Sequence, residues 1–123
     1  MFSIVIPLYN KAHTIIYTLQ TVLNQTYTDF EVVIINDGSS DDGVALIQKF
    51  TNDDRVRIIN QHNQGVSAAR NRGIVEAKNE WIAFLDADDE WDKEYLKSTQ
   101  DAIARFSEAG MIINGRSSKN FQT

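Results

Sequence analysis

The chain of 123 residues contains no cysteine, which excludes disulfide bonds and thiolate chemistry. Basic residues are also scarce: 12 lysines and arginines against 17 acidic residues give a net charge of -5, which argues against non-specific nucleic-acid binding. The first apolar run is far too short to span a bilayer and has no basic segment before it. We therefore expect a cytoplasmic domain, which reaches the inner face of a membrane only through a missing segment or a partner.

Other absences simplify the reading further. The sequence has no repeats, linkers or low-complexity tracts, and its length suits one domain with an ordinary hydrophobic content of 42%. His13 and His62 lack partners at metal-ligand spacing, so neither is assigned a role. The only proline, Pro7, cannot donate to a central strand ladder and is expected to end the first strand.

Short apolar runs alternate with helical patterns along the chain. We predict strands over residues 3–6, 30–35, 55–59, 81–85 and 109–113. Helices are expected over about 11–24, 66–78 and 92–108, and another helix follows Ser39 or Ser40 and runs to about residue 50. Arginines alternate with apolar residues in 55–59, as in a half-exposed edge strand. Strands and helices in this alternation predict right-handed βαβ units and a parallel, doubly wound α/β sheet.

Polar and small residues mark the expected helix ends. Asn10 is a candidate N-cap for the first helix, and Ser39 or Ser40 for the second. Asp92 is a candidate cap for the last helix. Gly73 lies inside the third helix, where glycine costs stability relative to alanine, so close packing against the sheet is its expected reason.

The stretch from Trp81 to Asp92 starts as a buried strand and ends in carboxylates. If the chain stays extended, Asp86 and Asp88 face the same way while the small Ala87 turns aside. Converging carboxylates repel each other unless a cation lies between them, and hard oxygen ligands suit Mg²⁺ or Mn²⁺. The plainer alternative is an acidic surface loop that caps the next helix.

Topology predicts where a ligand would bind. In doubly wound sheets, ligands bind beyond the carboxyl ends of the strands where the strand order reverses. If the order is 3-2-1-4, the loops carrying Asp37 and Asp86 flank the loop 7–10. With strands about 4.8 Å apart, these two aspartates would lie on the order of 10 Å from each other. That span suits a nucleotide laid across the first strand, with the base or ribose at Asp37 and the pyrophosphate at Asp88.

Four motifs resemble, in order and spacing, those of the family 2 glycosyltransferases with the GT-A fold. They are Ile4-Val5-Ile6-Pro7-Leu8-Tyr9-Asn10, Asn36-Asp37-Gly38-Ser39, Asn63-Gln64-Gly65 through Ala69-Arg70-Asn71-Arg72-Gly73, and Asp86-Ala87-Asp88-Asp89. The match covers roughly residues 2–96. It implies the nucleotide-binding half of that fold: a Rossmann-like, doubly wound, mostly parallel sheet of about five strands with helices on both faces.

The resemblance also implies a function and a set of site residues. The reaction would be metal-dependent, inverting transfer of a sugar from a nucleotide-diphosphate sugar, with a UDP-sugar favoured, to a saccharide or lipid-linked acceptor. The metal, Mn²⁺ or Mg²⁺, would lie at Asp88 and Asp86. The nucleotide sugar would be bound by Pro7, Tyr9, Asp37, Arg70, Asp86 and Ala87, with Pro7 and Tyr9 shaping the nucleoside pocket and Arg70 reaching the base.

Inversion also needs a carboxylate that takes the acceptor's proton. The family carries this base in a later segment, and we find no candidate for it here; Glu108 is expected to lie on a helix that packs elsewhere. We therefore expect residues 1–113 to form an incomplete donor-binding domain, followed by a polar tail over 114–123. Alone, it should bind nucleotide weakly and not transfer sugar.

Alternatives remain open for several of these residues. Asp37 can be a turn residue, Arg70 can pair with Glu76 or Asp86, and Asn63 and Gly65 can simply shape the start of the third helix. A non-catalytic nucleotide-sugar binding module and a nucleotidyltransferase are the rival functions. The second usually needs a glycine-rich basic loop after the first strand, which is absent. A phosphoacceptor receiver module is excluded because the sequence lacks the acid pair after the first strand and the lysine after the fifth that such a module needs.

Overall fold

A computed structural model of the chain describes residues 1–108 and 121–122. The elements follow in the order β1 (Phe2–Leu8), α1 (Ala12–Leu23), β2 (Phe30–Asp37), α2 (Gly43–Phe50), β3 (Val56–Gln61), α3 (Val66–Glu76), β4 (Trp81–Phe84), α4 (Tyr95–Glu108) and β5 (Phe121–Gln122). The first four strands and the four helices are those that the sequence pattern predicts. Their bounds differ from the predicted ones by a few residues.

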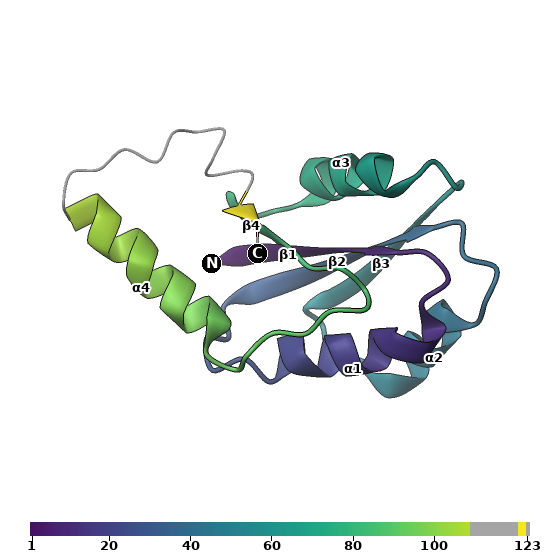
Figure 1. Ribbon diagram of the computed structural model, residues 1–123, viewed down its shortest axis with the longest axis horizontal. Helices are drawn as coiled ribbons and strands as arrows, with labels where there is room; N and C mark the ends of the chain where they lie inside the picture. The colour runs from purple at the N-terminus through teal and green to yellow at the C-terminus, as the bar shows by residue number, and fades with distance from the viewer. Residues whose placement is uncertain (109–120, 123) are drawn as a thin grey trace.

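The strands form one parallel sheet in the order β3-β2-β1-β4-β5 (Figure 1). β1 lies inside the sheet, paired with β2 over its whole length and with β4 over Phe2–Val5. β3 is an edge strand, as its alternating arginines predict. The predicted order 3-2-1-4 and the Rossmann-like, doubly wound architecture are therefore confirmed.

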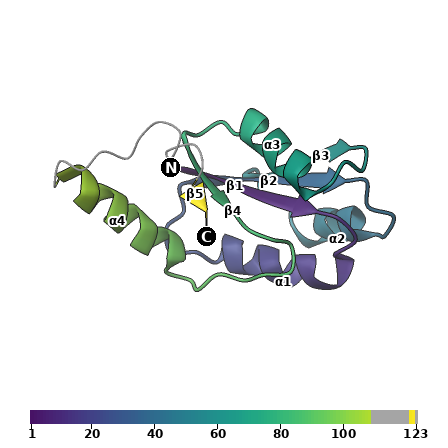
Figure 2. The ribbon, with the colours of Figure 1, turned by 45° about the horizontal axis from the view of Figure 1, so that its top comes forward.

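Helices cover both faces of the sheet, with α1 and α2 on one side and α3 on the other (Figures 1 and 2). Alternate residues of each central strand enter different cores. On β1, Ile4 and Ile6 pack with Ile15 and Leu19 of α1, whereas Val5 packs with the α3 side. Burial on both faces explains why these strands read as continuous apolar runs.

Gly73 brings α3 unusually close to the sheet. A Cβ atom built on Gly73 would lie only 2.2 Å from Cγ1 of Val5, so no side chain fits there. The prediction of close helix–sheet packing at this glycine is confirmed. The contact fixes how far α3, which carries Arg70, stands from β1.

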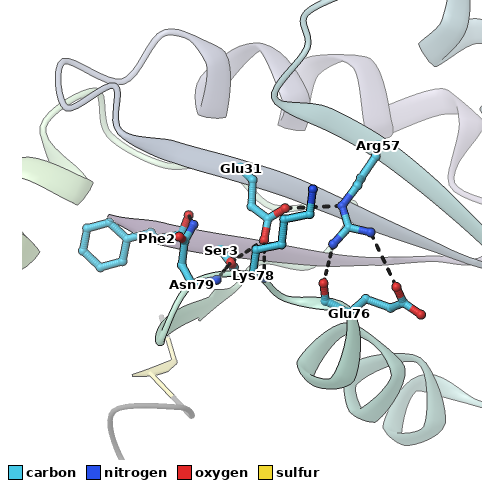
Figure 3. A network of polar contacts seen from close by, with 7 residues as sticks. All are labelled: Phe2, Ser3, Glu31, Arg57, Glu76, Lys78 and Asn79. Atoms are coloured by element: carbon cyan, nitrogen blue, oxygen red, sulfur yellow. Dashed lines mark hydrogen bonds and ion pairs between the residues drawn. The ribbon is translucent and has the colours of Figure 1, made fainter.

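A polar network connects the C-terminal end of α3 to the amino ends of the strands (Figure 3). The carboxylate of Glu31 accepts hydrogen bonds from the Ser3 hydroxyl at 2.6 Å and the Lys78 N–H at 2.7 Å. Arg57 pairs with Glu31 and also donates to the backbone carbonyl of Glu76, the last residue of α3. The network ties β1, β2, β3 and the end of α3 together, away from the carboxyl ends of the strands.

Two of the predicted caps are wrong. Asn10 has a left-handed backbone, with φ of 52°, and its side chain accepts a hydrogen bond from the Ser40 N–H instead of capping α1. The serines do not cap α2 either. Asp41 lies between the two helix starts, where it accepts from the Ala12 N–H at 3.0 Å and the Gly43 N–H at 3.1 Å. One carboxylate thus serves both helices, a long-range contact that local patterns do not reveal.

The C-terminal part also differs from expectation. The predicted strand over 109–113 lies outside the described residues. The short β5, Phe121–Gln122, pairs with β4 inside the stretch that we expected to be a polar tail. α4 extends away from the sheet, and its first turn is held by the buried Leu96 and by stacking of Tyr95 on Trp91, with ring centroids 4.6 Å apart (Figure 1). Across the described part of the chain, the helices are too short or too polar to cross a membrane.

Candidate functional site

A cleft of about 510 Å³ opens at the carboxyl ends of β1, β2 and β4. It is lined by Pro7, Leu8, Tyr9, Lys11, Asp37, Asn63, Gly65, Val66, Ala69, Arg70, Asp86, Ala87 and Asp88. The three loops and the start of α3 meet here because parallel strands all end at the same edge of the sheet. Every residue that we predicted to bind a nucleotide sugar or a metal lies on this lining.

Asp37 forms the buried wall of the cleft, with only 3% of its surface exposed. One carboxylate oxygen accepts hydrogen bonds from the Gln61 side chain and the Gln64 N–H, each at 2.9 Å. The other accepts from the Gly65 N–H at 2.9 Å and the Asn63 side chain at 3.2 Å. The carboxylate therefore organises the loop that leads into α3.

The hydrogen bonds keep Asp37 ionised. Burial alone raises the pKa of this carboxyl group, but the donors from Gln61, Gln64 and Gly65 stabilise the charged form and hold the pKa below its usual value. Gly65 contributes a backbone with φ of 100°, a conformation that favours glycine. The alternative that Asn63 and Gly65 shape the start of α3 is thus confirmed.

The acidic loop after β4 is a turn and not the extended segment that we expected. The Asp89 N–H donates to the Asp86 carbonyl at 3.0 Å, so the chain reverses at Ala87 and Asp88. Within the turn, Ala87 is buried and its carbonyl is held by Thr14 and Thr18 of α1. Both carboxylates still line the cleft, where they are exposed.

Each exposed carboxylate is paired with a different cation. Arg70 Nη2 lies 3.2 Å from Asp86 Oδ1, and Lys11 Nζ lies 3.2 Å from Asp88 Oδ2. The alternative that Arg70 pairs with Asp86 is confirmed, and its partner is not Glu76. Within residues 1–108 and 121–122 no cluster of three or more His, Cys, Asp or Glu side chains is arranged to hold a metal. The described residues therefore offer a metal at this place the carboxylates of Asp86 and Asp88 and no larger cluster.

A row of polar side chains on α1 holds the acidic loop by its backbone. Thr14 and Thr18 both donate to the Ala87 carbonyl at 3.0 Å, and Thr18 also donates to the Asp89 carbonyl at 2.6 Å. Further along, Thr21 accepts from the Trp91 N–H and Gln25 donates to the Asp92 carbonyl. Thr14, Thr18 and Thr21 lie on one face of α1, and Gln25 continues the row just beyond the end of the helix at Leu23.

Sequence reasoning missed this row and the role of Lys11. The signal was present: Thr18 interrupts the apolar stripe of α1, and both Thr18 and Gln25, which lies just beyond the helix, are buried. Buried polar side chains require hydrogen-bond partners. Because the backbone groups of the strands are already paired within the sheet, such side chains predict contact with the backbone of a loop. Lys11 stands between the first strand and its helix, where only the three-dimensional structure shows that it faces Asp88.

The fold and the cleft define a class of protein. A doubly wound parallel sheet with carboxylates beyond β2 and β4 is typical of domains that bind nucleotides across the central strand. The model of the family described as "Glycosyl transferase family 2" matches residues 3–122. The chain belongs to this family.

Similar proteins agree with that assignment. The chain is 44% identical over 89 residues to an uncharacterized glycosyltransferase, YibD, of Escherichia coli, which covers 72% of this chain and 26% of that protein. The crystal structure of S. aureus TarS 1-349 in complex with UDP-GlcNAc superposes with a TM-score of 0.77 at 32% identity, covering 87% of this chain and 31% of the TarS 1-349 chain. The mannosyltransferase PcManGT from Pyrobaculum calidifontis, in complex with GDP-Man and Mn²⁺, shares the fold with a TM-score of 0.78 at 24% identity, over 84% of this chain and 32% of that protein. The chain thus spans about a quarter to a third of the length of YibD, TarS 1-349 and PcManGT, and 19% of the longer TarS structure.

Proposed function

We infer that the cleft binds a nucleotide-diphosphate sugar as the donor of an inverting glycosyl transfer, with a UDP-sugar favoured. The observation that carries this proposal is the meeting of Asp37, Asp86 and Asp88 on one cleft from loops that flank β1. Support comes from the family and from TarS, whose structure contains UDP-GlcNAc. Asp37 and its loop lie at the nucleoside end, with Pro7 and Tyr9, and Asp86 and Asp88 lie at the diphosphate end.

The acidic end of the cleft fits a hard divalent cation, Mn²⁺ or Mg²⁺. Asp86 and Asp88 offer carboxylate oxygens that are open to solvent, so water and phosphate oxygens can complete the coordination shell. Such a cation would supply Lewis-acid stabilisation of the negative charge that develops on the leaving diphosphate. The likeness in fold to PcManGT, which contains Mn²⁺, is consistent with this choice of metal.

The proton acceptor of the transfer is not assigned. Among the described residues, the carboxylates on the cleft are Asp37, Asp86 and Asp88, and all three have binding roles in the proposal. The acceptor, a saccharide or a lipid-linked saccharide, is likewise proposed from the family alone. Binding of the donor nucleotide is therefore the property that this chain can be tested for.

The test is isothermal titration with UDP and GDP, with and without Mn²⁺. We expect Mn²⁺-dependent binding, tighter for UDP, that is lost in Asp88→Ala because one of the two carboxylates is gone. Asp54→Ala serves as the matched control, since it removes an exposed carboxylate before β3, away from the cleft. Binding that is absent, or equally strong without Mn²⁺, would contradict the proposal.

A further inference from the structure

The two carboxylates of the acidic loop are neutralised by the chain itself. Arg70 comes from α3 and Lys11 from the loop before α1, so cations from opposite sides of the sheet converge on one turn. Two negative and two positive side chains leave this end of the cleft without net charge. In the described part of the chain, no other cation is paired with Asp86 or Asp88.

These ion pairs are placed to open easily. The side chains of Lys11 and Asp88 are 40% and 49% exposed, and those of Arg70 and Asp86 are 33% and 57% exposed. Exposed ion pairs contribute little to stability because water solvates the separated charges almost as well. By contrast, the backbone of the same loop is fixed by Thr14 and Thr18. The side chains can therefore exchange partners without moving the loop.

We propose that Lys11 and Arg70 are exchangeable counterions: they occupy the acids until a divalent cation binds there, and then turn to the donor's diphosphate. This rests on the function proposed above. Charge balance favours it, because a divalent cation adds two positive charges and a diphosphate diester adds one negative charge per phosphate. With Lys11, Arg70, Asp86 and Asp88 counted, this end of the cleft is then neutral both before and after binding.

Arg70 has unused capacity for the second task. Its Nε atom is buried and has no hydrogen-bond partner among the described residues, although its Nη2 atom pairs with Asp86. An unpaired buried donor is unfavourable, and a guanidinium can satisfy it by a bidentate contact to phosphate oxygens. Lys11 offers a point charge with three donors on a flexible stem, which reaches a phosphate oxygen without a fixed geometry.

The exchange predicts effects of opposite sign, which a purely structural role would not produce. In Lys11→Met and in Arg70→Met, a competing cation is gone, so Mn²⁺ alone should bind about twofold to fivefold more tightly. UDP in saturating Mn²⁺ should bind about tenfold more weakly, since a charge-assisted contact to the diphosphate is lost.

Mn²⁺ binding is measured by the electron paramagnetic resonance signal of the free ion, and UDP binding by titration calorimetry. Lys49→Met is the control for net charge, because Lys49 is exposed on α2 and remote from the cleft. Thermal unfolding monitors the fold of each variant. Opposite changes in the two affinities, absent from the control, support the exchange.

The contrary outcomes are distinct. Unchanged or weaker Mn²⁺ binding in both variants, with the unaltered chain binding UDP, overturns the exchange and leaves the proposed function standing. A change in Lys49→Met equal to that in Lys11→Met shows a general charge effect and also overturns it. Failure of the unaltered chain to bind UDP or GDP with Mn²⁺ overturns the proposed function and the exchange together.

Discussion

Asp37 is a carboxylate whose surroundings are complete before any ligand enters. Each of its oxygens accepts two hydrogen bonds, which fills the acceptor sites a carboxylate normally offers. The carboxylates of its exposed counterparts, Asp86 and Asp88, each pair with one cation, Arg70 and Lys11 respectively. Residues of the same type thus play different parts in one cleft, and their surroundings determine which.

Replacing Asp37 by asparagine should therefore cost stability. The amide NH₂ must face donors whichever way it is turned, because both oxygens accept from N–H groups. We expect the free energy of unfolding to fall by about 1–3 kcal/mol. Urea unfolding measures this, with Asp88→Asn as the control, for which a change within about 0.5 kcal/mol is expected. Equal stabilities of the two variants would contradict this account of Asp37.

At the scale of elements, α1 has two functions on adjoining faces. Its apolar side packs on the sheet through Ile15, Leu19 and Val22, and its polar row holds the acidic loop. Thr18 is central to that row because its hydroxyl reaches the carbonyls of both Ala87 and Asp89. Helix and loop therefore form one unit, although about seventy positions separate them in the chain.

Thr18→Val tests that unit, because valine keeps the shape and removes the donor. The Ala87 carbonyl then keeps only Thr14 and the Asp89 carbonyl loses its hydroxyl partner. We expect a loss of about 1–2 kcal/mol in stability together with weaker Mn²⁺-dependent UDP binding. Thr26→Val is the matched control, since its exposed hydroxyl contacts Lys93 and Glu94 near α4 and not the acidic turn. Undiminished UDP affinity in Thr18→Val would show that the loop keeps its shape without this hydroxyl.

The sequence predicted elements better than the contacts between them. Periodicity located β1 to β4 and the four helices, and the order 3-2-1-4 that we assumed for a doubly wound sheet is the observed one. The cap at Asn10 failed because Asp41, from another loop, reaches the start of α1. At α2 the same Asp41, which directly follows Ser40 in the sequence, accepts from Gly43 in place of the serines. The extended form of the acidic loop failed as well: the loop is a turn whose Ala87 carbonyl is held by Thr14 and Thr18 from a distant element. Local patterns carry no record of such partners.

For the whole molecule, buried carboxylates predict sensitivity to acid. Burial alone raises the pKa of Glu31, but hydrogen bonds from Ser3 and Lys78 and the charge of Arg57 bring it below its usual value, and Asp37 is shifted in the same direction. The unfolded chain then binds more protons than the folded one at low pH. The stabilisation is complete above about pH 5 and is lost as pH falls through the lowered folded values.

We expect the urea midpoint to drop between about pH 5 and about pH 3, and to drop less in Glu31→Gln because one of the linked groups is gone. The comparison is made at constant ionic strength, since Glu31 also belongs to the network that includes Arg57 (Figure 3). A midpoint that is flat over this interval, or an unaltered drop in Glu31→Gln, would argue against the linkage.

The difference between the Asp37 end and the Asp86–Asp88 end of the cleft affects how selectively each end binds a ligand. The wall near Asp37 is preorganised by hydrogen bonds, so a ligand that fits it binds without rearrangement of the protein. A ligand of another shape finds no complementary surface there. Near Asp86 and Asp88 the side chains can exchange ion-pair partners while the backbone remains hydrogen-bonded to α1. We therefore expect the end at Asp37 to discriminate between ligands, and the end at Asp86 and Asp88 to accept ligand groups of different geometry.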